Sequence, residues 1–326
     1  MKVIKFFAIT AMAAAMITSC SNEDELSQSN YPSDNIIRVT AGVNNAKTRA
    51  EGAGTPLENP LSLTVVNKNV PKYTYVDQEF SKTSGDWACS ETLLWQKSDA
   101  LVDIVAFAPA QTGKFNGVYA NGSIQPIAYS VAKDQTTADD KNDLLYYYAK
   151  DFNPGESLDK GKLNIQFNHA FCMIDINVTL GTEFNKPEVL KESPIVKVTL
   201  GGTKIAANVN VTNAASVVTI SETDAATDIT TTKGSFDKAA DPEANAKSHF
   251  SCIAIPQTVG ANTFKVSLKT AGKLYEWTSD KEITLQSGYR YTLNLTMGDN
   301  VVLLKGGSIT ATPWTEITSD KPLETD

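Results

Sequence analysis

Histidine and cysteine, which often build catalytic and metal sites, are scarce in this sequence. Two histidines and four cysteines occur among 326 residues. His169 and His249 lie beside apolar, strand-like runs, and neither belongs to a spacing that coordinates zinc. The Gly-x-Ser-x-Gly motif is absent, and no glycine-rich phosphate loop follows a predicted strand. We therefore expect structural histidines, no metal, no cofactor and no enzymatic activity.

Disulfide bonds also find little support. Cys20 belongs to the N-terminal segment discussed below, which leaves Cys89, Cys172 and Cys252. An odd number of cysteines cannot pair completely within one chain. Cys172 and Cys252 lie in apolar strand-like settings, which favours buried thiols over metal ligands or nucleophiles.

Long apolar runs are missing too, because no segment reaches the roughly 18 residues that cross a bilayer as a helix. The run from Phe6 to Ile17 follows two lysines and ends in Ile17-Thr-Ser-Cys20, the pattern of a secretory signal peptide with a bacterial lipobox. We predict that residues 1–19 are removed and that Cys20 carries lipid, including palmitate. An ordinary signal peptide with a chance cysteine is the alternative.

Residues 20–35 are polar and predict a flexible tether. The acidic cluster at residues 23–25 resembles the export signal of Bacteroides-type surface lipoproteins, and a solvated linker is the alternative reading. Loss of Lys2 and Lys5 with the signal peptide changes the formal net charge from −8 to −10. This acidity argues against nucleic acid as a partner.

Arginine is also rare, because only three of the 29 lysines and arginines are arginines. Arg38 and Arg290 lie in predicted strands. Arg49 lies in a run of small and polar residues behind the first predicted strand, and exposed loops are where proteolysis concentrates. An arginine-specific protease would therefore cut between Arg49 and Ala50, and an uncut connecting loop is the alternative.

The residues that are abundant predict strands. Runs rich in Val, Ile, Thr, Tyr and Phe are broken by Gly, Pro, Asn and Asp, and no helix longer than two or three turns is indicated. Many short strands with regular turn signals predict an all-β sandwich or barrel. The length suits two domains, which we place at residues 36–165 and 166–326. The main predicted strands are 36–43, 61–67, 72–76, 101–108, 123–130, 144–150, 163–180 with a possible bulge near His169, 195–200, 204–211, 217–220, 250–255, 263–270, 274–278, 289–297 and 307–314.

Two segments remain open at this point. Residues 221–247 predict either a long surface loop or an irregular hairpin. The triplet Tyr146-Tyr147-Tyr148 invites a sugar-stacking hypothesis. However, adjacent residues of a strand point to opposite faces, so at least one of these tyrosines should be in the core.

Several segments, in their order along the chain, are similar to the fimbrillin family of Bacteroidota. They are the lipobox at Cys20, Thr48-Arg49-Ala50, Asp143-Leu-Leu-Tyr, Ile165-Gln-Phe-Asn-His169-Ala-Phe-Cys-Met-Ile-Asp-Ile, Ile283-Thr-Leu-Gln-Ser-Gly-Tyr289-Arg-Tyr291, and Ile309-Thr-Ala-Thr-Pro-Trp314. This resemblance implies two tandem transthyretin-like β-sandwich domains. It also implies a structural subunit of a fimbria at the outer membrane and cell surface, with other fimbrial subunits as partners.

The resemblance further implies assembly by strand exchange. An arginine-specific surface protease would remove the strand at residues 36–43, whose apolar side chains share one face because they sit two apart: Ile37, Val39, Ala41 and Val43. Another subunit would fill the groove with its C-terminal strands, for which the candidate residues are Val301, Val302, Leu303, Leu304, Ile309 and Trp314. The alternative is a surface lipoprotein that never polymerises and binds a glycan or a host protein.

Overall fold

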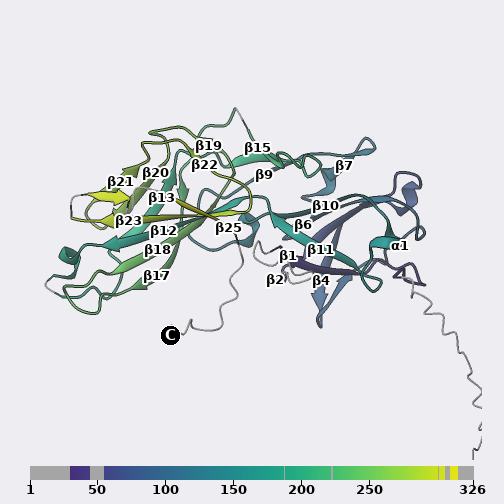
Figure 1. Cartoon of the computed structure of the whole chain (residues 1–326), viewed down its shortest axis with the longest axis horizontal. Coiled ribbons are helices and arrows are strands. Elements are labelled where there is room, and N and C mark those ends of the chain that lie inside the picture. The colour runs from purple at the N-terminus through teal and green to yellow at the C-terminus, as the bar shows by residue number, and fades with distance from the viewer. Residues whose placement is uncertain are drawn as a thin grey trace, which may run out of the picture.

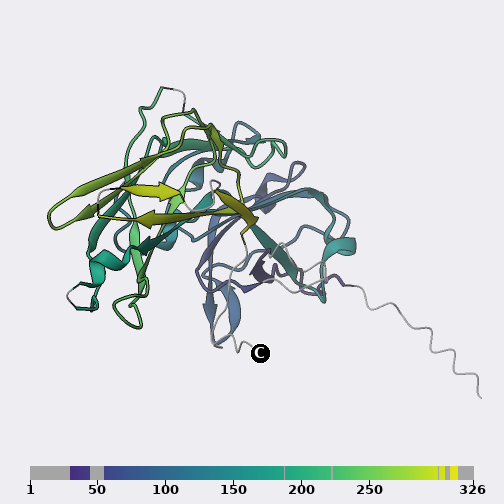
Figure 2. The ribbon, with the colours of Figure 1, turned by 60° about the vertical axis from the view of Figure 1, so that its left-hand side comes forward.

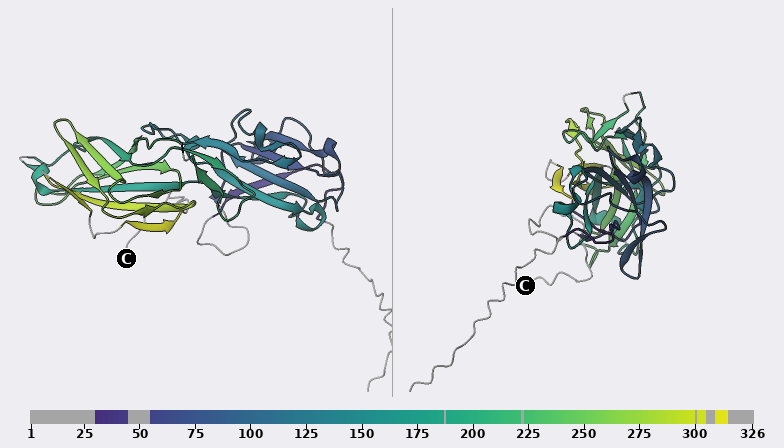
Figure 3. Two further views of the ribbon diagram at one scale, coloured as in Figure 1. Left: turned by 90° about the horizontal axis from the view of Figure 1, so that it is seen from above. Right: turned by 90° about the vertical axis from the view of Figure 1, so that its right-hand side faces the viewer.

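Nearly all regular structure is β-strand in the computed structural model, which describes residues 30–44, 55–186, 188–221, 223–299, 301–304 and 309–314. The strands form two groups of sheets that follow one another along the long axis of the molecule (Figure 1 and Figure 3). The all-β fold class predicted from the sequence is confirmed. None of the helices in these ranges is long and apolar enough to cross a membrane. The described helices are α1 (Pro154–Ser157) and the 3-10 turns η1 (Pro71–Tyr73), η2 (Asn116–Val118), η3 (Asp140–Asn142) and η4 (Thr182–Asn185).

The N-terminal group is built on one eight-stranded sheet. Its order is β2 (Thr55–Pro56), β1 (Val39–Val43), β11 (Leu163–His169), β10 (Leu145–Phe152), β6 (Val102–Ala108), β3 (Leu61–Val66), β4 (Tyr75–Thr83) and β5 (Asp86–Cys89). All neighbours are antiparallel except β1 and β11, which run parallel. A small hairpin of β7 (Tyr119–Ala120) and β8 (Ser123–Ile124) lies beside this sheet.

The C-terminal group has a sheet ordered β17 (Thr232–Asp237), β18 (Lys247–Ala254), β12 (Cys172–Leu180), β23 (Tyr289–Met297) and β24 (Val302–Leu304), with β25 (Thr310–Pro313) also on β23. A second sheet is ordered β16 (Ile229–Thr230), β13 (Ile195–Gly201), β20 (Lys265–Thr270) and β21 (Leu274–Thr278). A third joins β15 (Val218–Ile220), β14 (Ala206–Val209) and β9 (Ile127–Ser130), and β19 (Thr258–Val259) pairs with β22 (Ile283–Thr284). Strand β9 therefore ties the N-terminal half of the chain to the C-terminal group.

Two clusters of buried residues fill the molecule, and strand β6 contributes to both. Ile104 and Ala106 belong to the first core, which also holds Ile37, Leu63 and Phe167. The residues between and after them, Val105 and Phe107, belong to the second core. Every residue of β6 is buried because each face of this central strand is covered. The tyrosine triplet of β10 alternates in the same way, with Tyr147 on the first core and its two neighbours on the second.

The run at residues 163–180 forms two strands rather than one bulged strand. Strand β11 ends at His169 in the eight-stranded sheet, and β12 begins at Cys172 in the C-terminal sheet. The buried side chains lie at odd positions before the break and at even positions after it, because Ala170 and Phe171 shift the alternation by one residue. This short crossing connects the two groups of sheets. The predicted domain division stays a prediction.

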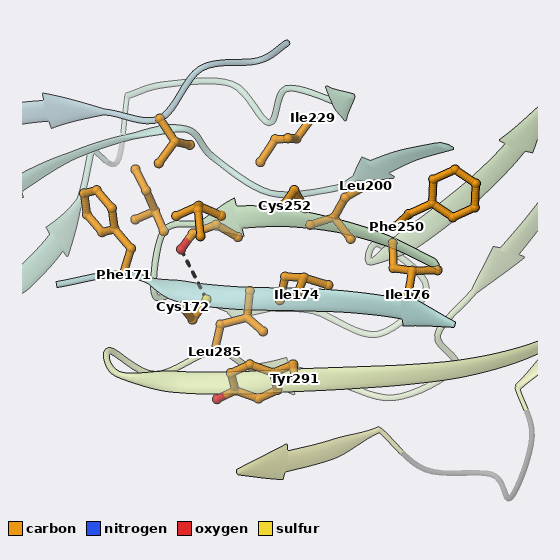
Figure 4. Packing of buried hydrophobic residues seen from close by; sticks show 14 of the residues in the cluster. Phe171, Cys172, Ile174, Ile176, Leu200, Ile229, Phe250, Cys252, Leu285 and Tyr291 are labelled. Atoms are coloured by element: carbon orange, nitrogen blue, oxygen red, sulfur yellow. Dashed lines mark hydrogen bonds between the residues drawn. The ribbon is translucent and has the colours of Figure 1, made fainter. Parts of the chain in front are cut away.

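Strand β12 runs through the middle of the second core (Figure 4). In this view, Leu200 and Phe250 lie above Ile174 and Ile176 of β12, and Leu285 and Tyr291 lie below the strand. The thiol of Cys172 donates to the carbonyl of Ala254 across the β12–β18 pair at 3.2 Å. Cys172 and Cys252 are buried and unpaired by a disulfide, and burial raises the pKa of both thiols.

One further segment matches one of the two alternatives from the sequence, and another differs from the prediction in detail. Of the two alternatives for residues 221–247, the irregular hairpin is observed, because β17 pairs antiparallel with β18 with a register shift between Lys233 and Phe236. The predicted strand at 72–76 is instead η1 followed by the longer β4, which forms a tight hairpin with β5 around Ser84 and Gly85. Both turn residues have positive φ angles, 54° and 96°, as a two-residue hairpin requires.

Candidate assembly site

Strand β1 lies near the edge of the eight-stranded sheet. It pairs in parallel with β11 over five residues, from Val39 opposite Leu163 to Val43 opposite Phe167. On its other side only the two residues of β2 pair with it. The ladder groups of β11 that face β1 would therefore be left without main-chain partners if β1 were removed, which is the situation that accepts an added strand.

The apolar side chains of this segment face the first core. Ile37, Val39 and Val43 are 4%, 4% and 3% exposed, and Ala41 is half-buried against the same cluster. Thr40, between them, is exposed. The strand itself is shorter than the predicted segment at 36–43, because the backbone N–H of Ile37 donates to the carbonyl of Leu93 at 2.9 Å rather than to β11.

The residues predicted for lipidation and proteolytic cleavage are Cys20, Arg49 and Ala50, and all three lie outside the described residues. In the sequence, Arg49 and Ala50 fall in the connection between β1 and β2. Arg38 directly precedes β1, and its guanidinium pairs with Asp34 at 2.5 Å. That pairing holds the pKa of Asp34 at about 2.

The third arginine is held within the C-terminal sheet. Arg290 lies in β23, and its Nε is 3.4 Å from Oδ2 of Asp175 on the neighbouring strand β12. Both side chains are about three-quarters buried, with exposed fractions of 26% and 24%. Burial raises the pKa of Asp175, although the nearby Arg290 lowers it.

The C-terminal strands β24 and β25 lie one after the other along the outer edge of β23 (Figure 2). Val302 is buried, whereas Val301 and Leu303 are 49% and 58% exposed. All four residues of β25 are exposed, and Ile309 before it is half-buried. The side chain of Leu304 lies outside the described part of the structure. Strand β25 is therefore held mainly through main-chain pairing with β23, whereas β24 also places Val302 in the second core.

Trp314 is the buried end of this C-terminal segment. Trp314 is 4% exposed, and its ring stacks on the ring of His169 with the two centroids 3.8 Å apart. The Nδ1 atom of His169 lies 2.9 Å from Oδ1 of Asp143, which immediately precedes Leu144 and β10. The backbone N–H of Trp314 donates to the carbonyl of Gly288 at 2.7 Å. Trp314 is thus held at the crossing between β11 and β12.

The structure does not bring the candidate displaced strand and the candidate donor together. Strand β1 belongs to the eight-stranded sheet, and β24 and β25 belong to the C-terminal sheet. The stack between Trp314 and His169 was not anticipated, and no local spacing links two residues so far apart in the sequence. His249, the other histidine, accepts or donates bonds with Asn177 and Asp237 on adjoining strands. Within the described residues no group of three or more His, Cys, Asp and Glu side chains could hold a metal ion.

Comparisons with solved structures agree with this fold. A putative cell adhesion protein from Bacteroides ovatus superimposes with a TM-score of 0.62 at 17% identity, covering 86% of this chain and 98% of that one. A putative cell adhesion protein from Bacteroides uniformis gives 0.55 at 15% identity, covering 87% and 100%. A fimbrial protein from Bacteroides vulgatus gives 0.52 at 16% identity, covering 85% and 99%. At these identities the likeness concerns the fold alone.

No curated protein matches this sequence. The model of one family, described as fimbrillin-like, matches residues 40–314, which include β1, the crossing at His169 and the C-terminal strands through Trp314. The chain therefore belongs to the fimbrillin-like family.

Proposed function

We propose that this chain is a structural subunit of a cell-surface fimbria that is exported as a lipoprotein on Cys20 and polymerises by strand exchange. Cleavage between Arg49 and Ala50 would free the segment that contains β1. A C-terminal segment of the next subunit would then take its place beside β11. The observation that carries this proposal is the position of β1, which places Val39 and Val43 in the first core yet has only one full-length neighbouring strand.

The contacts of the segment at residues 36–43, which includes β1, explain why it would be replaced rather than simply lost. Burial of a Val or Ile side chain contributes about 1.5–3 kcal/mol. Ile37, Val39 and Val43 are all buried, so their burial sums to about 5–9 kcal/mol, before the five ladder pairs with β11 are considered. Cleavage alone would leave the strand in place. A competing strand that offers similar side chains and the same main-chain groups would lower the barrier to its exit.

The C-terminal strands have the properties of a donor. They lie at a sheet edge, and β25 places no buried side chain in the core. Val301 and Leu303 are two of the six large apolar side chains classed as exposed in the described part of the chain. Exposed apolar groups on a strand gain stability when a groove covers them. Release of this segment requires that Trp314 leave its place on His169.

Truncation of the C-terminal strands tests whether they act as the donor in the proposed exchange. Wild type and a form truncated after Met297 are purified as precursors, digested with an arginine-specific protease and run on gels without boiling. Wild type is expected to stay monomeric before digestion and to form ladders after it. The truncated form is expected to remain monomeric, because it lacks β24 and β25. A one-to-one mixture of cleaved truncated protein and cleaved wild type should give short ladders, because the truncated chain still has a groove.

The same experiment distinguishes the alternative function. If wild type never forms ladders under any protease treatment, a non-polymerising surface lipoprotein is the better account. If the form truncated after Met297 forms ladders like wild type, the donor lies elsewhere in the chain and the proposed exchange is wrong.

A further inference from the structure

A pocket of about 450 Å³ lies where the two groups of sheets meet. It is lined by Tyr146 of β10 and by residues 214–218, 256–258 and 284–287. These segments adjoin β15, β19 and β22, which are grouped above the centre of the molecule (Figure 1). The volume lies within the range of about 300–1,000 Å³ that small-molecule sites occupy. We call it the Tyr146 pocket.

The lining of the Tyr146 pocket carries no charge, although 20% of the residues of the protein are charged. Its polar side chains are hydroxyls and primary amides, from Ser, Thr, Tyr and Gln, and its apolar ones include Val217 and Leu285. An anion or a metal ion would find no counter-charge among these residues. A neutral saccharide fits them, because hydroxyl groups need both donors and acceptors while the C–H face of a sugar ring packs on apolar and aromatic surface.

The walls of the pocket are held in place by hydrogen bonds. The hydroxyl of Tyr291 accepts from the N–H of Gln286 at 2.8 Å and donates to the carbonyl of Thr284 at 3.0 Å. Leu285 and Gln257 exchange two backbone hydrogen bonds at 2.9 and 3.1 Å. On the opposite segment, the N–H of Ser216 donates to the carbonyl of Asn213 at 3.1 Å. A pocket that is already formed loses little conformational entropy when it binds.

Some polar side chains of the pocket form hydrogen bonds within the protein, and others do not. The amide of Gln257 is fully engaged with the backbone of Lys204 and Ile255. In the described part of the chain, the side chains of Tyr146, Gln286 and Ser287 make no hydrogen bond, and Gln286 is exposed. The Tyr146 hydroxyl can both donate and accept a hydrogen bond, and burial raises its pKa further above the ordinary value for tyrosine.

We propose that the Tyr146 pocket binds a neutral saccharide, with the hydroxyls of Tyr146 and Ser287 and the amide of Gln286 as its polar contacts. The ring of Tyr146, half-buried against the second core, and the side chain of Val217 provide the surface for the sugar ring. This site is separate from the proposed assembly site, because none of its residues lies in β1, β24 or β25. Sugar binding and polymerisation can therefore fail independently.

The test measures binding of three defined sugars to the purified full-length precursor without its signal peptide. Lactose, maltose and N,N′-diacetylchitobiose are tested by saturation-transfer NMR and calorimetry, each at about 10 mM, which is ten times a dissociation constant of about 1 mM. At least one of them is expected to bind. Absence of binding by all three overturns the proposal.

Variants then locate the bound sugar. Gln286→Ala removes an exposed side chain and is expected to weaken binding about tenfold, as loss of a hydrogen bond does. Ala215→Trp places a large ring at an exposed position of the rim and is expected to abolish binding. Tyr146→Phe should weaken binding several-fold, whereas Tyr148→Phe, a matched change two residues along the same strand, should have no effect. Binding that survives Ala215→Trp unchanged, with a normal melting temperature, places the sugar elsewhere and refutes the site.

Discussion

The release of β1 after cleavage should depend on the side chains that it buries. In a Val39→Ala/Val43→Ala double variant, each substitution removes two methyl groups from a residue that is at most 4% exposed. Transfer of about 0.8 kcal/mol per group, with a further term for the cavity left behind, gives about 2 kcal/mol per site. The two sites together weaken the docking of β1 by about 3–4 kcal/mol. That free energy corresponds to a few hundred-fold in an equilibrium constant or a dissociation rate.

The assay follows two signals after addition of an arginine-specific protease. Mass spectrometry of fractions from size exclusion reports when the N-terminal fragment leaves, and unboiled gels report ladder formation. We expect the double variant to stay monomeric before cleavage, with a lowered melting temperature. After cleavage it should release its fragment and form ladders much faster than wild type, because exit of β1 precedes or accompanies entry of the donor.

Two controls separate docking of β1 from general stability. Thr40→Ala changes an exposed residue of the same strand and should leave the rates of wild type. Val266→Ala in β20 truncates an equally buried valine of the second core and should lower the melting temperature without accelerating release. If the double variant forms ladders at the rate of wild type, or if Val266→Ala accelerates them equally, the reasoning about β1 is refuted.

Three further predictions address the anchor, the crossing and the pH dependence. Cys20→Ala is expected to leave the membrane fraction and to incorporate no labelled palmitate, and unchanged membrane association would contradict the lipobox interpretation. His169→Ala removes the ring under Trp314 and the partner of Asp143, so it should cost about 2–4 kcal/mol in urea unfolding, whereas His249→Ala, at a more exposed site, should cost much less. Equal effects of the two changes would refute the role of the stack. Burial raises the pKa of Tyr129 to about 12, so the folded state holds this proton more tightly than the unfolded chain, and the resulting stabilisation is present below about pH 10 and is lost between about pH 10 and 12. Tyr129→Phe should lower stability near neutral pH by about 1–2 kcal/mol, because it loses bonds to Gln111 and Lys141, and should flatten the alkaline decline; an unchanged slope in thermal melts across this range would contradict it.

Much of the secondary structure could be predicted from alternation and turn residues. Strands β3, β6, β13 and β23 have bounds within a residue of those predicted, because their buried faces are apolar and their ends carry Gly, Pro or polar residues. Strand β4 was predicted too short and β5 was not predicted, because Phe80 is the only fully buried side chain in either of them. A strand that packs through half-buried polar residues gives a weak pattern in the sequence.

The pairing of the strands could not be predicted from the sequence. The parallel alignment of β1 with β11 joins residues 124 positions apart, and nothing in either segment specifies that partner or its direction. The phase shift at Ala170–Phe171 was visible, but a shift of one residue describes a bulge as well as a passage between sheets. Packing of the whole chain decides between them. The Tyr146 pocket depends on three distant segments, so the sequence suggested a sugar-binding tyrosine without the amide and hydroxyl groups beside it.

The central claim, assembly by strand exchange after cleavage at Arg49, is tested most directly on the polymer itself. Fimbriae are sheared from intact cells, the subunits are separated, and the N-terminus of each is identified by mass spectrometry. The account predicts subunits that begin at Ala50 and lack the peptide at residues 36–43. Polymerised subunits that begin at Cys20, with residues 36–43 still attached, would contradict it.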